Sequence, residues 1–263
     1  SQLGRDTCWT SVMPQGDLTD RVVNEFRSVG VDVSHICIKP EGRVALYFME
    51  PGEYPMPARV LYDREHTPFR DVRVEDLDWE AMLDTKLVFV TGITAALTEN
   101  TAVVVSHFVE EAHRRGIAVA LDVNYRSLLW EPRRAREVLE SIACISDIVF
   151  CSVRDGMAVF GIESDGEQAC HDLRELFGAP TVVSTDQING VYLSDDEHGD
   201  HTFPVVQVPV VDRPGAGDSF VAGTLHGYLA GDVVQGIYYG QRTSSYALTH
   251  YGDLTRVSPS ELN

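Results

Sequence analysis

The stretch VDRPGAGDSFVAG at residues 211–223 decides the fold of this chain. It places a glycine-rich turn between the β-prone run FPVVQVPVV at residues 203–211 and a segment with apolar residues at helical spacing. Gly215 and Gly217 let the backbone approach a ligand closely because glycine has no Cβ. The free N–H groups at a helix start attract anions, so the pattern predicts a phosphate site. The stretch is neither a G-x-x-x-x-G-K-[ST] loop nor a G-x-G-x-x-G turn.

Asp218 lies in the first turn of this predicted helix. A carboxylate is a poor ligand for phosphate, because like charges repel, but it can accept a proton from a neighbouring hydroxyl. The alternative is that Asp218 only complements the positive end of the helix dipole. Taken alone, the pattern does not separate the two interpretations.

Strand-like and helix-like segments alternate from residue 85 onward. The strands are short apolar runs, and the helices are amphipathic and end near glycine or begin with proline. This alternation predicts a mostly parallel sheet covered by helices on both faces, a three-layer α/β/α fold. The expected strands are residues 86–92, 117–124, 147–152, 181–185 and 190–194, and the expected helices are residues 100–115, 132–145 and 165–177.

Residues 36–69 break this alternation. Two β-prone pieces, VALYFME and ARVLYDRE, flank the turn-rich EPGEYPMP, and no helix fits between them. We expect a β-hairpin that stands off the main sheet as a small lid, with a long surface loop as the alternative. The expected organisation is therefore an α/β core of residues 1–35 and 70–263 and a lid of residues 36–69.

The first residues, SQLGRDTCW, precede a helical pattern at residues 18–29 without a recognisable strand. Folds of this type usually open with a strand, so we expect the N-terminal strand to be missing.

The chain is strongly acidic, with 40 Asp and Glu against 21 Lys and Arg and a formal charge of −19. Nucleic acid is therefore an unexpected partner, because binding it needs a basic face. Only two of the basic residues are lysines. An acidic, lysine-poor surface suits concentrated salt and suggests a halophilic archaeal source, with an ordinary acidic cytosolic enzyme as the alternative.

The five cysteines form no C-x-x-C pair and the nine histidines show no ligand-like spacing. These patterns predict neither a disulfide framework nor a metal framework, and they favour the cytoplasm. No apolar run is long enough to span a bilayer, so no membrane association is expected.

The run from Asp212 to Asp218 resembles the D-x-x-G-A-G-D signature of the ribokinase-like sugar kinases, and the resemblance covers the whole chain. It implies that Asp218 is the catalytic base and that Gly215, Ala216 and Gly217 form the anion hole for the phosphoryl group. It also implies ATP and Mg²⁺ as cofactors and in-line phosphoryl transfer.

Within that family the sequence is most similar to the 2-keto-3-deoxygluconate kinases. The block DVNYRSLLW at residues 122–130 and the run LYDR at residues 61–64 resemble their substrate-binding segments. An arginine fork suits the carboxylate of a sugar acid, and the end of a parallel strand is where ligands collect. The substrate-binding residues implied are Tyr47, Tyr62, Arg64, Asp122, Asn124, Arg126 and Asp253. A sheet-edge ion pair with Asp122 is the alternative for Arg126, and plain packing the alternative for Tyr62.

The nucleotide site departs from the family pattern in two places. The run SVRD keeps Ser152 and offers Asp155 in place of the usual magnesium-directed glutamate, although Arg154 between them is unexpected. The run TDQING keeps Thr185 and Gly190 but replaces a middle glycine with Gln187. Gln241 is expected near the adenine, with an exposed helix position as the alternative.

The favoured function is ATP-dependent phosphorylation of 2-keto-3-deoxygluconate at its terminal hydroxyl. The partners expected are the sugar acid, ATP and a second copy of the chain, paired through the β lid. Two alternatives stay open: a kinase of a neutral sugar such as fructose or ribose, and a non-catalytic sugar or nucleotide binder that kept the fold.

Overall fold

A computed structural model describes residues 1–50, 52, 56 and 59–262. Its main sheet has six strands in the order β10-β9-β8-β7-β6-β5. The strands β5 to β8 are parallel, and β9 and β10 extend the sheet in antiparallel fashion. The strands are β5 (Leu87–Thr91), β6 (Ala118–Asp122), β7 (Ile148–Phe150), β8 (Thr181–Asp186), β9 (Gly190–Asp195) and β10 (Gly199–Phe203). The expected α/β fold with a mostly parallel sheet is confirmed.

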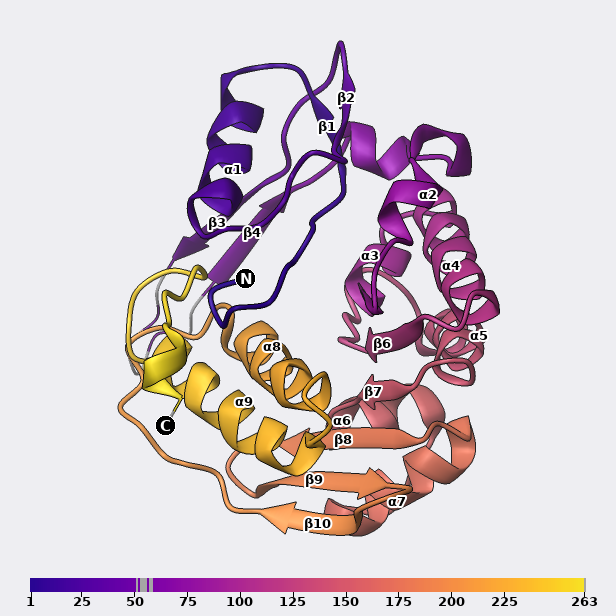
Figure 1. Ribbon diagram of the computed structural model, residues 1–263, viewed down its shortest axis with the longest axis vertical. Helices are drawn as coiled ribbons and strands as arrows, with labels where there is room; N and C mark the ends of the chain where they lie inside the picture. The colour runs from indigo at the N-terminus through magenta and orange to yellow at the C-terminus, as the bar shows by residue number, and fades with distance from the viewer. Residues whose placement is uncertain (51, 53–55, 57–58, 263) are drawn as a thin grey trace.

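Helices cover both faces of this sheet (Figure 1). Alternation along each strand divides its side chains between two cores: Val119 and Leu121 of β6 pack with the first set of helices, and Ala120 packs with the second. The first set is α3 (Gly92–Ala96), α4 (Glu99–Arg114), α5 (Pro132–Ala143) and α7 (Gly166–Phe177), and the second is α8 (Ala216–Tyr228) and α9 (Val233–Leu248).

Local sequence explains the helix ends. Thr98 caps α4 by accepting a hydrogen bond from the Thr101 N–H at 3.2 Å. Pro132 occupies the first turn of α5, where a backbone N–H would have no acceptor within the helix, so proline loses no hydrogen bond there. Gly178 ends α7 in the left-handed conformation.

The helices α8 and α9 touch through glycines. A Cβ on Gly227 would lie 2.3 Å from the Cα of Gly236, and a Cβ on Gly223 would lie 2.7 Å from the Cα of Gly240. Four glycines therefore allow two backbones to meet directly. This contact holds the helix that begins with the glycine-rich turn against the rest of the core.

The expectation that no strand precedes the first helix is wrong. A strand β1 (Val12–Pro14) precedes α1 (Asp17–Ser28) and pairs in parallel with β2 (Cys37–Lys39), forming a separate two-stranded sheet. The strand is only three residues long and contains a proline, so it leaves little alternation to recognise. Short elements complete this region: α2 (Trp79–Met82) and single 3₁₀ turns at Pro68–Asp71 and Val74–Asp76.

The hairpin expected within residues 36–69 forms from β3 (Leu46–Glu50) and β4 (Arg59–Asp63), which are antiparallel. Part of its connection, residues 51, 53–55 and 57–58, lies outside the described residues. Residues 37–39 belong to the β1–β2 sheet instead. The hairpin stands beside the C-terminal segment, which is yellow in Figure 1.

The β-prone run at residues 203–211 does not continue the sheet as its composition suggests. Residues 204–212 form no strand, although they are rich in valine. The strand next to β9 is instead β10, whose sequence GDHTF is polar because it lies at the edge of the sheet.

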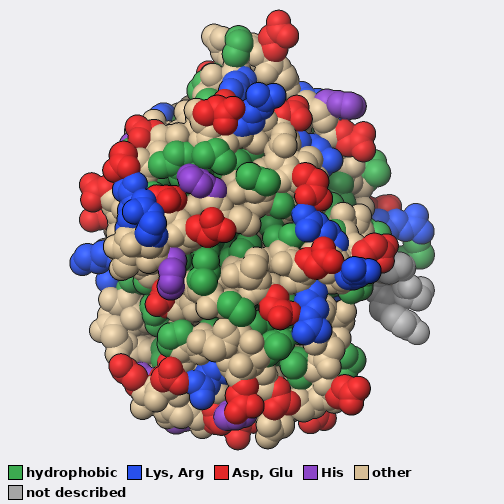
Figure 2. Space-filling model, turned by 90° about the vertical axis from the view of Figure 1, so that its right-hand side faces the viewer, with side chains coloured by type: hydrophobic (Ala, Val, Ile, Leu, Met, Phe, Trp, Pro, Cys, Tyr) green, Lys and Arg blue, Asp and Glu red, His purple; other side chains and the backbone are tan. Residues whose placement is uncertain are grey.

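In the described part of the chain no helix is long and apolar enough to cross a membrane. Figure 2 shows the face formed largely by the first set of helices, where basic side chains lie beside acidic ones. Arg114 pairs with Glu111, and Arg134 with Glu99.

We expect Gly227→Ala to lower the free energy of unfolding by about 1–3 kcal/mol, because the new methyl group forces α8 and α9 apart. Gly217→Ala is the matched control: on the same helix, its Cβ meets no atom within 4 Å. Urea unfolding of both variants measures the difference. Equal stabilities would contradict the role of the glycine contact.

Candidate active site

The glycine-rich turn is folded against the C-terminal loop. Gly215 precedes α8 with φ +74°, and a Cβ there would lie 2.7 Å from the carbonyl oxygen of Asp253. Only glycine fits a position with positive φ and such a close neighbour. The Asp212 carboxylate links the glycine-rich turn to the C-terminal loop. It accepts hydrogen bonds from the N–H of Arg213 at 2.8 Å and from the N–H of Gly252 at 3.1 Å. The first aspartate of the signature therefore has a structural task that the sequence did not reveal.

The start of α8 offers unpaired donors. Among the described residues the N–H groups of Gly217 and Asp218 have no hydrogen-bond partner, whereas the next amide, of Ser219, bonds to the Gly215 carbonyl at 2.8 Å. The space beside Gly217 is open. Two free amides at a helix start, facing open space, can bind an anion.

Asp218 lies directly at these amides and is exposed to solvent. Partial desolvation by the surrounding protein raises the pKa of its carboxyl group, and the positive charge of Arg126 opposes that rise. The charge of Asp253 raises the pKa further. A carboxylate with a raised pKa is a stronger base than an ordinary aspartate.

Asp122 ends β6 at the same edge of the sheet. Its carboxylate accepts a hydrogen bond from the Asn124 side-chain amide at 3.0 Å. Desolvation raises the pKa of Asp122 to about 7, and the charges of Asp218 and Asp155 contribute to that rise. Asn124 adopts φ +39°, a left-handed conformation that asparagine tolerates better than most residues.

Arg126 follows two residues later and is exposed. Its guanidinium donates a hydrogen bond to the Tyr125 carbonyl at 3.3 Å and makes no ion pair with Asp122 among the described residues. The sheet-edge ion pair considered for Arg126 is therefore not formed. Its charge lowers the pKa values of both Asp122 and Asp218, so it is the positive group among these acids.

The hairpin reaches the same place from the opposite side. The Tyr47 hydroxyl donates a hydrogen bond of 2.7 Å to the Asp253 carboxylate, which raises the pKa of Tyr47 to about 12. The rings of Tyr47 and its cross-strand partner Tyr62 lie 6.4 Å apart, and the Arg64 guanidinium stacks 4.1 Å from the centre of the Tyr62 ring. The Asp253 side chain therefore contacts the hairpin through Tyr47, while the Asp253 backbone packs against Gly215.

The residues assigned to the nucleotide have structural contacts of their own. The Ser152 hydroxyl caps the short helix α6 (Val153–Asp155) by accepting the Asp155 N–H at 3.0 Å. Asp155 is buried, with the Arg154 guanidinium 3.7 Å from its carboxylate. The short helix continues into a π-helical turn at Gly156–Phe160.

Thr185 and Gly190 lie at the turn between β8 and β9, where a Cβ on Gly190 would strike the Tyr192 ring at 2.8 Å. Gln241 is buried in α9, and its side chain accepts the Val206 N–H at 3.3 Å. The exposed position considered for Gln241 is wrong. In the described residues no hydrogen bond joins the side chain of Thr185 or Gln241, or the backbone of Gly190, to Asp218.

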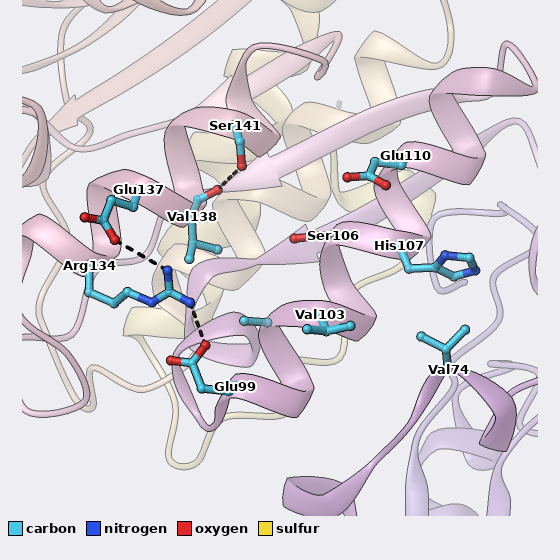
Figure 3. Close-up of a pocket in the computed structure, with 11 residues that line it drawn as sticks. Val74, Glu99, Val103, Ser106, His107, Glu110, Arg134, Glu137, Val138 and Ser141 are labelled. Atoms are coloured by element: carbon cyan, nitrogen blue, oxygen red, sulfur yellow. Dashed lines mark hydrogen bonds and ion pairs between the residues drawn. The ribbon is translucent and has the colours of Figure 1, made fainter.

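The two best-formed cavities lie away from Asp218. One of about 420 Å³ lies between α4 and α5, where Arg134 spans from Glu137 to Glu99 while His107 points toward Val74 (Figure 3). The other, of about 290 Å³, lies between α1 and the base of the hairpin and includes Arg64 in its wall. We assign the chemistry to the Asp218 region because the free amides and carboxylates gather there.

Asp122→Asn should stabilise the fold at pH 8 by an amount on the order of a few kcal/mol. The pKa of Asp122 is raised in the folded state, so ionisation costs stability as pH rises from 3.8, its ordinary value, toward 7. Asparagine removes that cost but keeps an acceptor for Asn124. Denaturant unfolding of both proteins between pH 4 and 8 measures the difference in their free energies of unfolding. We expect this difference to disappear near pH 4. A variant that is no more stable than wild type at pH 8 would contradict the raised pKa of Asp122.

Comparisons with known proteins show the family of the chain. The chain is 32% identical over 265 residues to 2-dehydro-3-deoxygalactonokinase of Haloferax volcanii, covering all of this chain and 82% of that one. It is 30% identical over 214 residues to 2-dehydro-3-deoxygluconokinase of Thermoproteus tenax, covering 80% and 63% of the two chains. The crystal structure of 2-dehydro-3-deoxygluconokinase from Thermotoga maritima superposes with a TM-score of 0.93 at 26% identity, covering 99% and 84%. Residues 1–260 match the family described as pfkB family carbohydrate kinase, and the chain belongs to that family of phosphotransferases.

Proposed function

We propose that the chain phosphorylates the terminal hydroxyl of a 2-keto-3-deoxy sugar acid, 2-keto-3-deoxygluconate or its galactonate epimer, with ATP as donor. The observation that carries the proposal is Asp218 beside the two free amides at the start of α8. A base and an anion cradle side by side are the two parts that phosphoryl transfer to an alcohol requires.

In the proposed reaction the Asp218 carboxylate accepts the proton of the sugar hydroxyl as its oxygen attacks the γ-phosphorus. The bond from that phosphorus to the β–γ bridging oxygen breaks, and ADP leaves. The amides of Gly217 and Asp218 bind the transferring phosphoryl group, and Gly215 allows the turn that presents them. The Ala216 side chain is too small to block the phosphoryl group from these amides. Most of the rate comes from positioning and from charge stabilisation.

Magnesium and ATP fit the residues present. Asp122 ends β6 and Asp155 lies in α6, the short helix after the neighbouring strand β7. Both offer carboxylate oxygens, the ligands that Mg²⁺ prefers, and the charge of Asp155 acts on Asp122. We assign Asp155 to the metal, directly or through water, and Ser152, Thr185, Gly190 and Gln241 to the nucleotide side. When bound, Mg²⁺ supplies positive charge to the phosphates. A ribokinase-like protein of Escherichia coli is described in complex with ATP and Mg²⁺.

The sugar-acid specificity follows from Arg126 and the hairpin. Arg126 is free of ion pairs in the described structure, which leaves its fork available for a carboxylate. Arg64 and Tyr62 approach from the lid, and Tyr47 anchors that lid to Asp253. Asn124 and Asp122 offer an amide and a carboxylate for sugar hydroxyls. All five cysteines are unpaired, and we propose the cytoplasm as the location.

Asp218→Asn should lower kcat at least about 100-fold, since general-base catalysis contributes 10²–10⁴-fold. The substitution keeps size and polarity but cannot accept the proton. Steady-state turnover of ATP with 2-keto-3-deoxygluconate in high salt measures kcat, and ATP binding by calorimetry should be unchanged. Turnover within threefold of wild type would remove Asp218 from the mechanism.

Arg126→Ala should raise KM for the sugar acid by a factor on the order of 10–100, because a charge-assisted hydrogen bond contributes about 1.5–3 kcal/mol. A panel containing both 2-keto-3-deoxy epimers, fructose and ribose separates the alternatives. A neutral-sugar kinase would show an unchanged KM for fructose or ribose and little turnover of the acids. No turnover of any sugar would favour the non-catalytic binder.

The hairpin also suggests how two copies pair. Tyr47 and Tyr62 face the site, whereas their strand neighbours Phe48 and Leu61 point to the opposite face and are 57% and 68% exposed. We propose that this outward apolar pair meets the same pair in a second copy, burying both. Leu61→Glu should therefore yield monomers in light-scattering measurements, whereas Leu128→Glu, at an 89% exposed position elsewhere, should not. A wild-type monomer would contradict the pairing.

A further inference from the structure

Three side chains with metal-binding atoms converge outside the kinase site. The Cys8 sulfur, an Asp32 carboxylate oxygen and a His35 ring nitrogen all lie within 4.8 Å of one another. None of these residues belongs to the groups proposed for phosphoryl transfer. The three come from two segments on either side of α1, so their sequence spacing resembles no metal motif.

The backbone holds the cluster in place. Cys8 and Asp32 pair as an isolated parallel bridge, in which the Asp32 N–H donates to the Thr7 carbonyl at 2.8 Å and the Trp9 N–H donates to the Asp32 carbonyl at 2.9 Å. The pairing continues along the same segment, since the Thr10 hydroxyl donates to the His35 carbonyl at 3.0 Å. The frame behind the three side chains is therefore built from long-range hydrogen bonds.

The side chains are oriented as well. One Asp32 oxygen accepts the Ser34 N–H at 2.8 Å in a tight local turn, which leaves its other oxygen 4.0 Å from the His35 Nε2. Among the described residues no lysine or arginine pairs with Asp32. The Asp32 carboxylate is therefore held by a backbone amide, and its second oxygen lies near the His35 imidazole and the Cys8 thiol. These three groups are the kinds of ligand that bind a divalent metal.

A nucleophilic triad is the competing interpretation of Cys, His and Asp. It requires hydrogen bonds from the cysteine to the histidine and from the histidine to the acid. In the described structure the Asp32–His35 separation of 4.0 Å is too long for a hydrogen bond, and none joins His35 to Cys8.

We infer that Cys8, Asp32 and His35 form a structural site for Zn²⁺ or a chemically similar divalent metal, which fastens residues 7–9 to residues 32–35. Sulfur, nitrogen and oxygen ligands together suit zinc and do not suit Mg²⁺ or Ca²⁺. Tetrahedral zinc with bonds of about 2.0–2.3 Å places its ligand atoms about 3.3–3.7 Å apart. The separations in the structure, at most 4.8 Å, include the 4.0 Å between Asp32 and His35, so metal binding has to draw the side chains closer together. Water completes the fourth position.

Cobalt(II) titration of the full chain, freed of metal by chelator, tests the site directly. One equivalent of Co²⁺ should produce a thiolate-to-cobalt charge-transfer band that excess Zn²⁺ abolishes. The band should be absent in Cys8→Ser and unchanged in Cys144→Ser, which removes the other exposed cysteine and is the matched control. Asp32→Asn keeps the local turn but should weaken affinity at least about 10-fold, since even losing a residue that only orients a ligand costs that much.

Zinc should also raise the midpoint of thermal unfolding of the wild type and of Cys144→Ser, but not of Cys8→Ser. If Cys8→Ser does not fold, His35→Gln decides, because it keeps the thiol and should still bind Co²⁺ at least about 10-fold more weakly. A wild type without the band, a band that survives Cys8→Ser, or affinity unchanged in His35→Gln would overturn the site.

Discussion

The candidate site depends on one contact, the packing of the Gly215 turn against the backbone of Asp253. Since any Cβ at Gly215 would overlap the Asp253 carbonyl, the two segments can lie this close only with glycine there. Asp212 then ties the turn to the C-terminal loop through two backbone amides. The start of α8, the lid residue Tyr47 and the acid Asp253 are consequently parts of one assembly, and a disturbance of the turn is felt by all of them.

The electrostatics of this assembly are unbalanced toward negative charge. Asp122, Asp155, Asp218 and Asp253 interact with one another, and Arg126 is the positive group that opposes them. Such repulsion lowers stability, and a divalent cation bound among these acids would offset it. A raised pKa at a cluster of acids on a sheet edge is typical of a functional site.

Much of this could be predicted from sequence because it is local. The alternation of apolar strands and amphipathic helices identifies β5 to β9, and the signature from Asp212 to Asp218 places the glycine-rich turn and the start of α8. Features that depend on distant segments were not predictable. The strand β1 is three residues long, β10 is polar, and the buried Gln241 bonds to a segment 35 residues away. The bond from Tyr47 to Asp253 spans 206 residues, and Cys8 meets Asp32 and His35 only through backbone pairing. No local pattern encodes such meetings.

The central claim is that the Asp218 carboxylate accepts a proton while held in a negative environment beside the anion cradle. The pH dependence of kcat/KM for the sugar acid, measured on wild type and on Asp253→Asn, tests it most directly. The account predicts that the rate falls as pH falls through a pKa above 3.8, the ordinary value for aspartate. It also predicts that the fall moves to lower pH in Asp253→Asn, because the charge of Asp253 raises the pKa of Asp218 and asparagine carries none. A rate that stays constant throughout the acid range in which the protein remains folded, or a fall that Asp253→Asn leaves unmoved, would contradict it.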